Sequence, residues 1–122
     1  MKTHYFDAIS TILQKSENSK VKLTVTGQSM YPTLCDGQLI EVDCFSGDAS
    51  QINIGDIIVY KAYKNNKEKQ HYIIHRVVHL FSILKHYFFI TKGDNNSRCD
   101  RYIIPSADII AIIKNTKNLH IL

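Results

Sequence analysis

The chain has 122 residues, of which 44% are hydrophobic and 21% are charged, and its formal net charge is +4. This length supports one hydrophobic core rather than two, and the composition excludes wholesale disorder. The positive charges are scattered, apart from a cluster at Lys61, Lys64, Lys67 and Lys69. We therefore do not expect a nucleic-acid partner, because dedicated nucleic-acid binders concentrate their positive charge more than this.

The first expected element is a helix within residues 1–19, followed by a β domain over residues 20–122, and both belong to a single folded unit. Thr3 can cap this helix, and apolar residues recur at helical spacing as far as Leu13. The pattern favours a helix that packs on the core or on a partner over one that lies in a membrane interface. Since no run approaches the roughly 18 apolar residues of a membrane span, we expect a soluble chain, cytoplasmic or peripherally attached to a membrane.

From residue 20 onward the sequence predicts short β-strands at 21–25, 39–42, 57–60, 72–74, 87–91 and 109–113. Turns rich in Gly, Asp and Asn separate several of them. The lysine cluster at 61–69 is expected at a solvated hairpin tip, with anionic lipid headgroups as the alternative contact. The predicted fold class is mainly β (α+β), a compact antiparallel β domain with one N-terminal helix.

The first candidate for chemistry is the segment 26–34, TGQSMYPTL. Pro32 prevents a strand from continuing through it, so Ser29 is expected where the chain turns. An exposed hydroxyl at such a turn, with backbone N–H groups nearby, suits a nucleophile whose oxyanion those amides stabilise. Taken alone, a Gly-x-Ser sequence before a turn is more often structural than catalytic.

A serine nucleophile needs a base, and His71, His75 and His79 recur at intervals of four. On a helix this spacing would form a metal-binding stripe, but the β-branched residues between the histidines favour a strand. Residues four apart in a strand are separated by about 13 Å, so we expect no metal site. We expect the three histidines to share one face of the strand, where one of them can point into a cleft.

The segment 91–101 carries two carboxylates, Asp94 and Asp100, in a polar turn. Its acidic spacing is similar to a calcium loop, but Arg98 occupies a ligand position, Cys99 stands where that loop needs Gly, and Pro105 replaces the bidentate Glu. A calcium loop of the EF-hand type is therefore excluded. Either carboxylate can orient an imidazole, and the alternative is a solvated turn.

Four segments, taken in order, resemble the successive conserved boxes of type I signal peptidases: 27–34 (GQSMYPTL), 55–60 (GDIIVY), 75–78 (HRVV) and 92–96 (KGDNN) with Asp100. That family shares its fold with the self-cleaving phage and SOS repressors. Because His75 stands where the bacterial branch and the repressors have a lysine, the chain is similar to the archaeal and endoplasmic-reticulum branch. The resemblance implies a serine endopeptidase without a cofactor, which cleaves leader or signal segments of small peptides or exported proteins.

The resemblance also implies the roles of individual residues. Ser29 would be the nucleophile and His75 the general base, since an imidazole with the reference pKa of about 6.5 is largely neutral at pH 7. Asp100 would orient the imidazole and Asp94 would shape the site, with the reverse assignment as the alternative. The geometry behind this choice is an expected hairpin that turns near residues 82–83 and places His75 opposite residues close to Ile90.

Four further residues, Gly27, Gln28, Met30 and Pro32, are expected to shape the substrate and oxyanion side of the site. Some relatives carry at the position of Gly27 a serine that assists the oxyanion hole, so here backbone N–H groups are the expected donors. Members of the family usually carry one or two membrane spans. The expected partners are therefore a peptide or leader-bearing substrate and either a membrane surface or a membrane protein.

Two other readings compete with this one. The chain could be a regulatory or self-cleaving module of the repressor-cleavage fold that has no peptidase activity in trans. It could also be a cysteine-based enzyme, because Cys35 follows Ser29 closely in the sequence. The odd number of cysteines, three in all, indicates a reducing compartment or free thiols.

Overall fold

A computed structural model describes residues 20–45, 47–62, 71–114 and 120–122. The expected helix at 1–19 and most of the lysine cluster at 61–69 lie outside the described residues. In the part of the chain that is described, no helix has the length and apolar character needed to cross a membrane.

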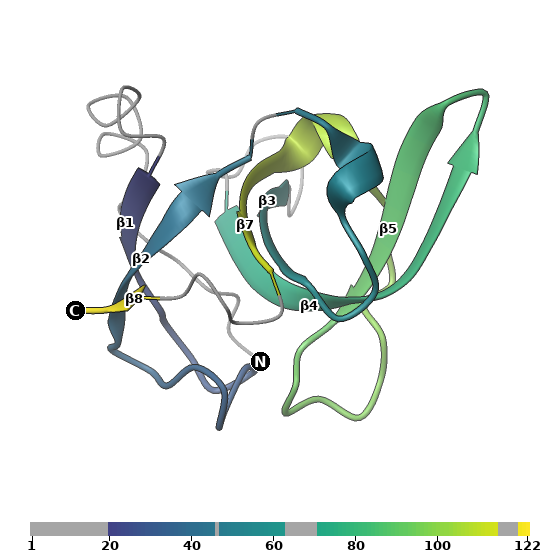
Figure 1. Cartoon of the computed structure of the whole chain (residues 1–122). Coiled ribbons are helices and arrows are strands. Elements are labelled where there is room, and N and C mark those ends of the chain that lie inside the picture. Colours follow the sequence, from purple (N-terminus) through teal and green to yellow (C-terminus); the bar gives the residue numbers. More distant parts are fainter. Residues whose placement is uncertain (1–19, 46, 63–70, 115–119) are drawn as a thin grey trace.

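The described chain is mainly β, as predicted, and every strand pairing in its sheet is antiparallel (Figure 1). The sheet has the order β1-β2-β7-β3-β4-β5-β6, and β8 pairs with β2. The strands are β1 (Lys20–Thr24), β2 (Leu39–Cys44), β3 (Ile57–Ala62), β4 (His71–Ile83), β5 (His86–Lys92), β6 (Ile104–Pro105), β7 (Ile109–Ile113) and β8 (His120–Ile121). Two short 3-10 helices are described, η2 (Ala49–Gln51) and η3 (Ser106–Asp108).

The centre of the sheet is covered on both faces, which explains why β3 is almost continuously apolar. Along β3, Ile57 and Val59 belong to one buried cluster, with β1, β2 and the turn after β1. Ile58 and Tyr60 belong to a second buried cluster, with parts of β4, β5 and the segment before β7. A strand buried on both faces loses the apolar–polar alternation of a half-exposed one, whereas β1 keeps that alternation.

The β4–β5 hairpin projects from the rest of the sheet (Figure 1) and differs from the predicted hairpin. Its turn lies at Leu84 and Lys85, not near residues 82–83, and both residues have positive φ (51° and 69°). Arg76 pairs with Lys92, so the position opposite His75 is the one just after β5 rather than Ile90. The expected pairing of these two strands is confirmed. The predicted position of the turn was wrong, because neither residue of this turn is one of the glycines or asparagines that normally mark it.

A β-bulge in β4 also corrects the prediction that the histidines share one face. Val77 pairs with Thr91 while His79 pairs with Ile90, so one extra residue of β4 lies between two consecutive residues of β5. The bulge reverses the facing of the side chains that follow it. His75 is therefore buried and His79 is exposed, whereas the side chain of His71 lies outside the described residues.

Candidate active site

Ser29 lies in a tight turn that follows β1 and returns the chain to β2. Gly27 adopts a φ of 93°, a left-handed conformation that glycine tolerates at little cost, and its amide donates to Asp36 Oδ1 at 2.7 Å. The amide of Tyr31 donates to the carbonyl of Gln28 at 3.1 Å. These two bonds fix the backbone on either side of the serine.

The serine itself is buried, with 2% of its surface exposed, which corrects the expectation of an exposed hydroxyl. The physical reason is that the loop after β5 lies against the turn. The amide of Asn95 donates to the carbonyl of Ser29 at 2.8 Å, and the side-chain amide of Asn95 donates to the carbonyl of Gln28 at 3.0 Å.

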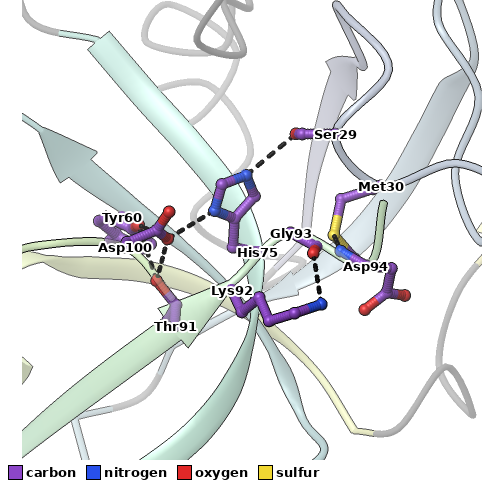
Figure 2. Close-up of polar contacts among 9 residues, drawn as sticks. All are labelled: Ser29, Met30, Tyr60, His75, Thr91, Lys92, Gly93, Asp94 and Asp100. Atoms are coloured by element: carbon purple, nitrogen blue, oxygen red, sulfur yellow. Dashed lines mark hydrogen bonds and ion pairs between the residues drawn. The ribbon is translucent and has the colours of Figure 1, made fainter. Parts of the chain in front are cut away.

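His75 connects this turn to the sheet (Figure 2). Its Nε2 lies 3.0 Å from Ser29 Oγ, and its Nδ1 lies 2.6 Å from Asp100 Oδ2. The imidazole is 2% exposed. The structure therefore brings together Ser29, His75 and Asp100, three of the residues chosen from the sequence, in hydrogen-bonding order.

Asp100 is held in the loop after β5 by neighbours from the sheet. Its amide donates to the carbonyl of Thr91 at 2.8 Å, and Thr91 Oγ1 donates to its Oδ2 at 2.6 Å. Tyr60 OH is 3.3 Å from the same oxygen. Burial alone would raise the pKa of Asp100, but hydrogen bonds from His75, Thr91 and Tyr60 and the charge of the imidazole outweigh it and lower the pKa.

Asp94 is bonded to other partners than the imidazole. Arg76 binds it through two bonds of 2.8 Å, Nε to Oδ1 and a terminal nitrogen to Oδ2, and Thr33 Oγ1 donates to Oδ2 at 2.6 Å. Burial opposes the charge of Asp94, but these bonds and the charges of Arg76 and Lys92 lower its pKa. Asp94 thus ties the strand that carries His75 to the turn that carries Ser29.

Gly93 permits this close assembly because it has no side chain. A Cβ built on it would lie 2.7 Å from the carbonyl oxygen of Ser29 and 3.1 Å from His75 Nε2. Both distances are shorter than ordinary van der Waals contacts. The backbone at this glycine therefore forms part of the wall around the serine and the imidazole.

The four residues expected to shape the substrate and oxyanion side all lie in the turn of Ser29. Met30 is fully buried, and its Sδ accepts a bond from the Asp94 amide at 3.3 Å. Pro32 is exposed and follows a cis peptide bond. Because the amide of Gly27 is already bonded to Asp36, an oxyanion would need other N–H groups than this one.

The sequence reading did not single out Tyr60, Thr91 or Thr33, which the structure places against the two carboxylates. Of the three, Tyr60 carries a signal in the sequence, since it is a phenol that directly follows three aliphatic residues of β3. Buried phenols usually have a hydrogen-bond partner. Thr91 gives no such signal, because threonine is common in strands.

The sequence also raised metal chemistry and thiol chemistry as alternatives. Within the described ranges, no three His, Cys, Asp or Glu side chains come close enough together to hold a metal ion. Cys35, Cys44 and Cys99 are free thiols. His75 contacts Ser29 Oγ through Nε2 and Asp100 Oδ2 through Nδ1.

A serine hydroxyl, an imidazole and a partly buried carboxylate in this order form the constellation that serine hydrolases use. Residues 11–80 match the family model described as signal peptidase, peptidase S26, so the chain belongs to this family of peptidases. The matched range includes Ser29 and His75 and ends before Asp94 and Asp100. No curated protein and no solved structure matches the chain.

Proposed function

We propose that the chain is a serine endopeptidase that cleaves leader or signal segments of small peptides or exported proteins, with Ser29 as nucleophile, His75 as general base and Asp100 as the carboxylate that orients the imidazole. The observation that carries this proposal is the pair of hydrogen bonds at His75, 3.0 Å to Ser29 Oγ and 2.6 Å to Asp100 Oδ2. These bonds occur in a chain of a peptidase family.

The proposed reaction begins when Ser29 Oγ attacks the scissile carbonyl and its proton passes to His75 Nε2. The C–N bond then breaks, the imidazolium returns the proton to the leaving amine, and an ester joins Ser29 to the acyl half of the substrate. Water, deprotonated by the same imidazole, hydrolyses this ester and restores the serine. Because Ser29 is 2% exposed, a substrate reaches the hydroxyl only after the surrounding side chains shift.

We also assign the chain to the histidine-base branch of the family. A lysine base would need a pKa lowered by several units through burial, whereas a neutral imidazole accepts the serine proton directly. The second nitrogen of the imidazole needs an acceptor, and Asp100 is in contact with it. We therefore expect kcat/KM to rise with pH over the range in which imidazoles lose their proton.

The test is cleavage of a library of leader-like peptides by the purified full chain. Ser29→Ala should reduce the rate by many orders of magnitude, whereas Ser82→Ala, at an exposed serine of β4, should leave it unchanged. His75→Ala should abolish cleavage and His79→Ala, on the opposite face, should not. Wild-type rates in Ser29→Ala would overturn the assignment, and cleavage of the chain itself without any cleavage in trans would favour the self-cleaving module.

A thiol mechanism is separated from this one by labelling. A fluorophosphonate should label the wild-type chain and not Ser29→Ala, because it reacts with activated serine hydroxyls. Blocking the thiols should leave cleavage unchanged. Loss of activity on alkylation of Cys35, with Ser29→Ala still active, would favour the cysteine-based reading.

The proposal includes a peripheral contact with a membrane surface. It is supported by the tip of the projecting β4–β5 hairpin, where Ile83 and Leu84 are 56% and 87% exposed, next to the cation of Lys85. Vesicles with anionic lipid should co-sediment the wild-type chain, and replacing Ile83 and Leu84 with serine should reduce this binding. Ile54→Ser, at another exposed isoleucine, is the matched control, and equal binding by all variants would dismiss the contact.

A further inference from the structure

One oxygen of Asp100 receives three hydrogen-bonding groups, and only one of them is the imidazole (Figure 2). Oδ2 lies 2.6 Å from His75 Nδ1, 2.6 Å from Thr91 Oγ1 and 3.3 Å from Tyr60 OH. The two hydroxyls are also 2.9 Å from each other. The carboxylate therefore belongs to a small network that extends into the core of the sheet.

The number of protons fixes the direction of this network. Each hydroxyl has a single proton to donate, and Thr91 gives its proton to Asp100 Oδ2. The single proton of Tyr60 then lies between two acceptors, Thr91 Oγ1 at 2.9 Å and Asp100 Oδ2 at 3.3 Å, and the shorter distance favours Thr91. Along the shorter distances the order of donation is Tyr60 to Thr91 to Asp100, with the phenol also close to the same carboxylate oxygen. An ionised carboxylate at the end of such a network shortens and strengthens its bonds.

The sheet holds the two hydroxyls in place, so that water does not easily replace them and their side chains do not easily change rotamer. Tyr60 and Thr91 are both fully buried, and they lie on β3 and β5, the two strands that flank the strand of His75. Tyr102 packs edge-on against Tyr60, with ring centroids 6.5 Å apart. A buried hydroxyl that loses its acceptor destabilises the fold, so the network resists rearrangement.

We propose that Thr91 and Tyr60 are positioning residues that hold Asp100 Oδ2 on His75 Nδ1 and thereby keep His75 Nε2 unprotonated toward Ser29. This inference rests on the proposed function. An ionised Asp100 fixed in place requires the proton of the imidazole to be on Nδ1, which leaves the lone pair of Nε2 for the serine proton. A displaced carboxylate permits the other tautomer, whose Nε2–H cannot accept that proton.

Thr91 should matter more than Tyr60 for this positioning. Its hydroxyl bond to Asp100 is 2.6 Å against 3.3 Å for the phenol, and its carbonyl also accepts the amide of Asp100 at 2.8 Å. Thr91→Val removes the hydroxyl and keeps the branched shape, whereas Thr91→Ser keeps the hydroxyl. Thr24→Val, at an exposed threonine of β1, is the matched control.

We expect Thr91→Val to lower kcat on a cleaved peptide by about tenfold with little change in KM, far less than the about 10⁴-fold loss that follows removal of an orienting aspartate. The acidic limb of its pH–rate profile should move to higher pH, since the carboxylate loses a donor to its charged form. Thr91→Ser should restore both properties, Tyr60→Phe should give a smaller effect, and Thr24→Val should give none. Equal kcat and equal pH profiles in wild type, Thr91→Val and Tyr60→Phe would overturn the proposal.

A second readout does not depend on activity. Nitrogen-15 NMR of the histidines in the full chain reports which ring nitrogen of His75 carries the proton. In wild type we expect the proton on Nδ1, with a downfield Nδ1–H resonance that moves upfield in Thr91→Val and stays in Thr91→Ser. If no peptide is cleaved but the resonances behave in this way, the proposed function fails and the positioning role stands. Identical resonances in all variants refute the positioning role. If Thr91→Val does not fold, the same comparison is made with Tyr60→Phe.

Discussion

Replacing each carboxylate of the site with its amide separates the two roles that we assign to Asp94 and Asp100. Asp94→Asn removes the charge that receives two bonds from Arg76 and one from Thr33. Asp100→Asn keeps one side-chain oxygen as an acceptor but removes the charge beside the imidazole. The first change should therefore act mainly on stability, and the second mainly on turnover.

The magnitude for Asp94→Asn follows from the burial of its ion pair. The side chains of Arg76 and Asp94 are 22% and 18% exposed, so this ion pair is intermediate in burial. Surface ion pairs contribute about 0–1 kcal/mol, and disruption of fully buried pairs costs about 3–5 kcal/mol. We expect a loss of about 2 kcal/mol in the free energy of unfolding. For a domain of this size the corresponding fall in Tm is roughly 8 °C.

The assay measures Tm and kcat/KM of both variants on one peptide. Asp94→Asn should lower Tm as stated and kcat/KM by no more than about tenfold, whereas Asp100→Asn should lower kcat by about 10⁴ with a small change in Tm. Asp43→Asn is the matched control, because its ion pair with Lys20 is exposed on both sides and should matter little for Tm. Full activity in Asp100→Asn, or a 10⁴-fold loss in Asp94→Asn at unchanged Tm, would refute the assignment.

Three further predictions concern stability and packing. Folding lowers the pKa of Asp94, so its ionised form stabilises the fold at pH values above the pKa of the unfolded chain, which is near 4, and this contribution is lost as the pH falls further. The difference in unfolding free energy between wild type and Asp94→Asn, measured in urea, should therefore be largest at pH 7 and shrink at pH 3. Gly93→Ala should abolish cleavage and lower Tm, because its Cβ would lie 2.7 Å from the carbonyl of Ser29 and 3.1 Å from His75 Nε2; wild-type kcat in this variant would contradict the packing. Lys85→Gly should raise Tm by several degrees without changing kcat, since a non-glycine residue at a φ of 69° costs about 1–2 kcal/mol, and an unchanged Tm would show that the turn is unstrained.

Much of the sheet could be predicted from the sequence because its long strands carry strong local signals. In β1 the apolar–polar alternation of the residues matches the alternation in burial. β7 and the first four residues of β3 are apolar runs, so both patterns are visible in the residues themselves. β6 and β8 have two residues each, too few to show any periodicity. They exist because long-range pairing with β5 and β2 supplies their hydrogen bonds.

The predictions that the structure corrects concern features that the local sequence does not encode. The turn at Leu84 and Lys85 has neither glycine nor asparagine, and the bulge before His79 shifts the register without a marker residue. The burial of Ser29 depends on a loop that follows it by more than sixty residues, through the bond from Asn95. In contrast, Ser29, His75 and Asp100 stood out because their residue types and order resemble a family whose chemistry requires them.

The contacts that define the site join parts of the chain that are distant in sequence. Ser29 and His75 are 46 positions apart, His75 and Asp100 are 25 apart, and Thr33 and Asp94 are 61 apart. Contacts of this kind form late in folding, because closing long loops costs entropy before any contact compensates for it. A chain still being synthesised therefore lacks the complete site until Asp100 has left the ribosome, and the peptidase activity that we propose would appear only once the β-sheet has closed around it.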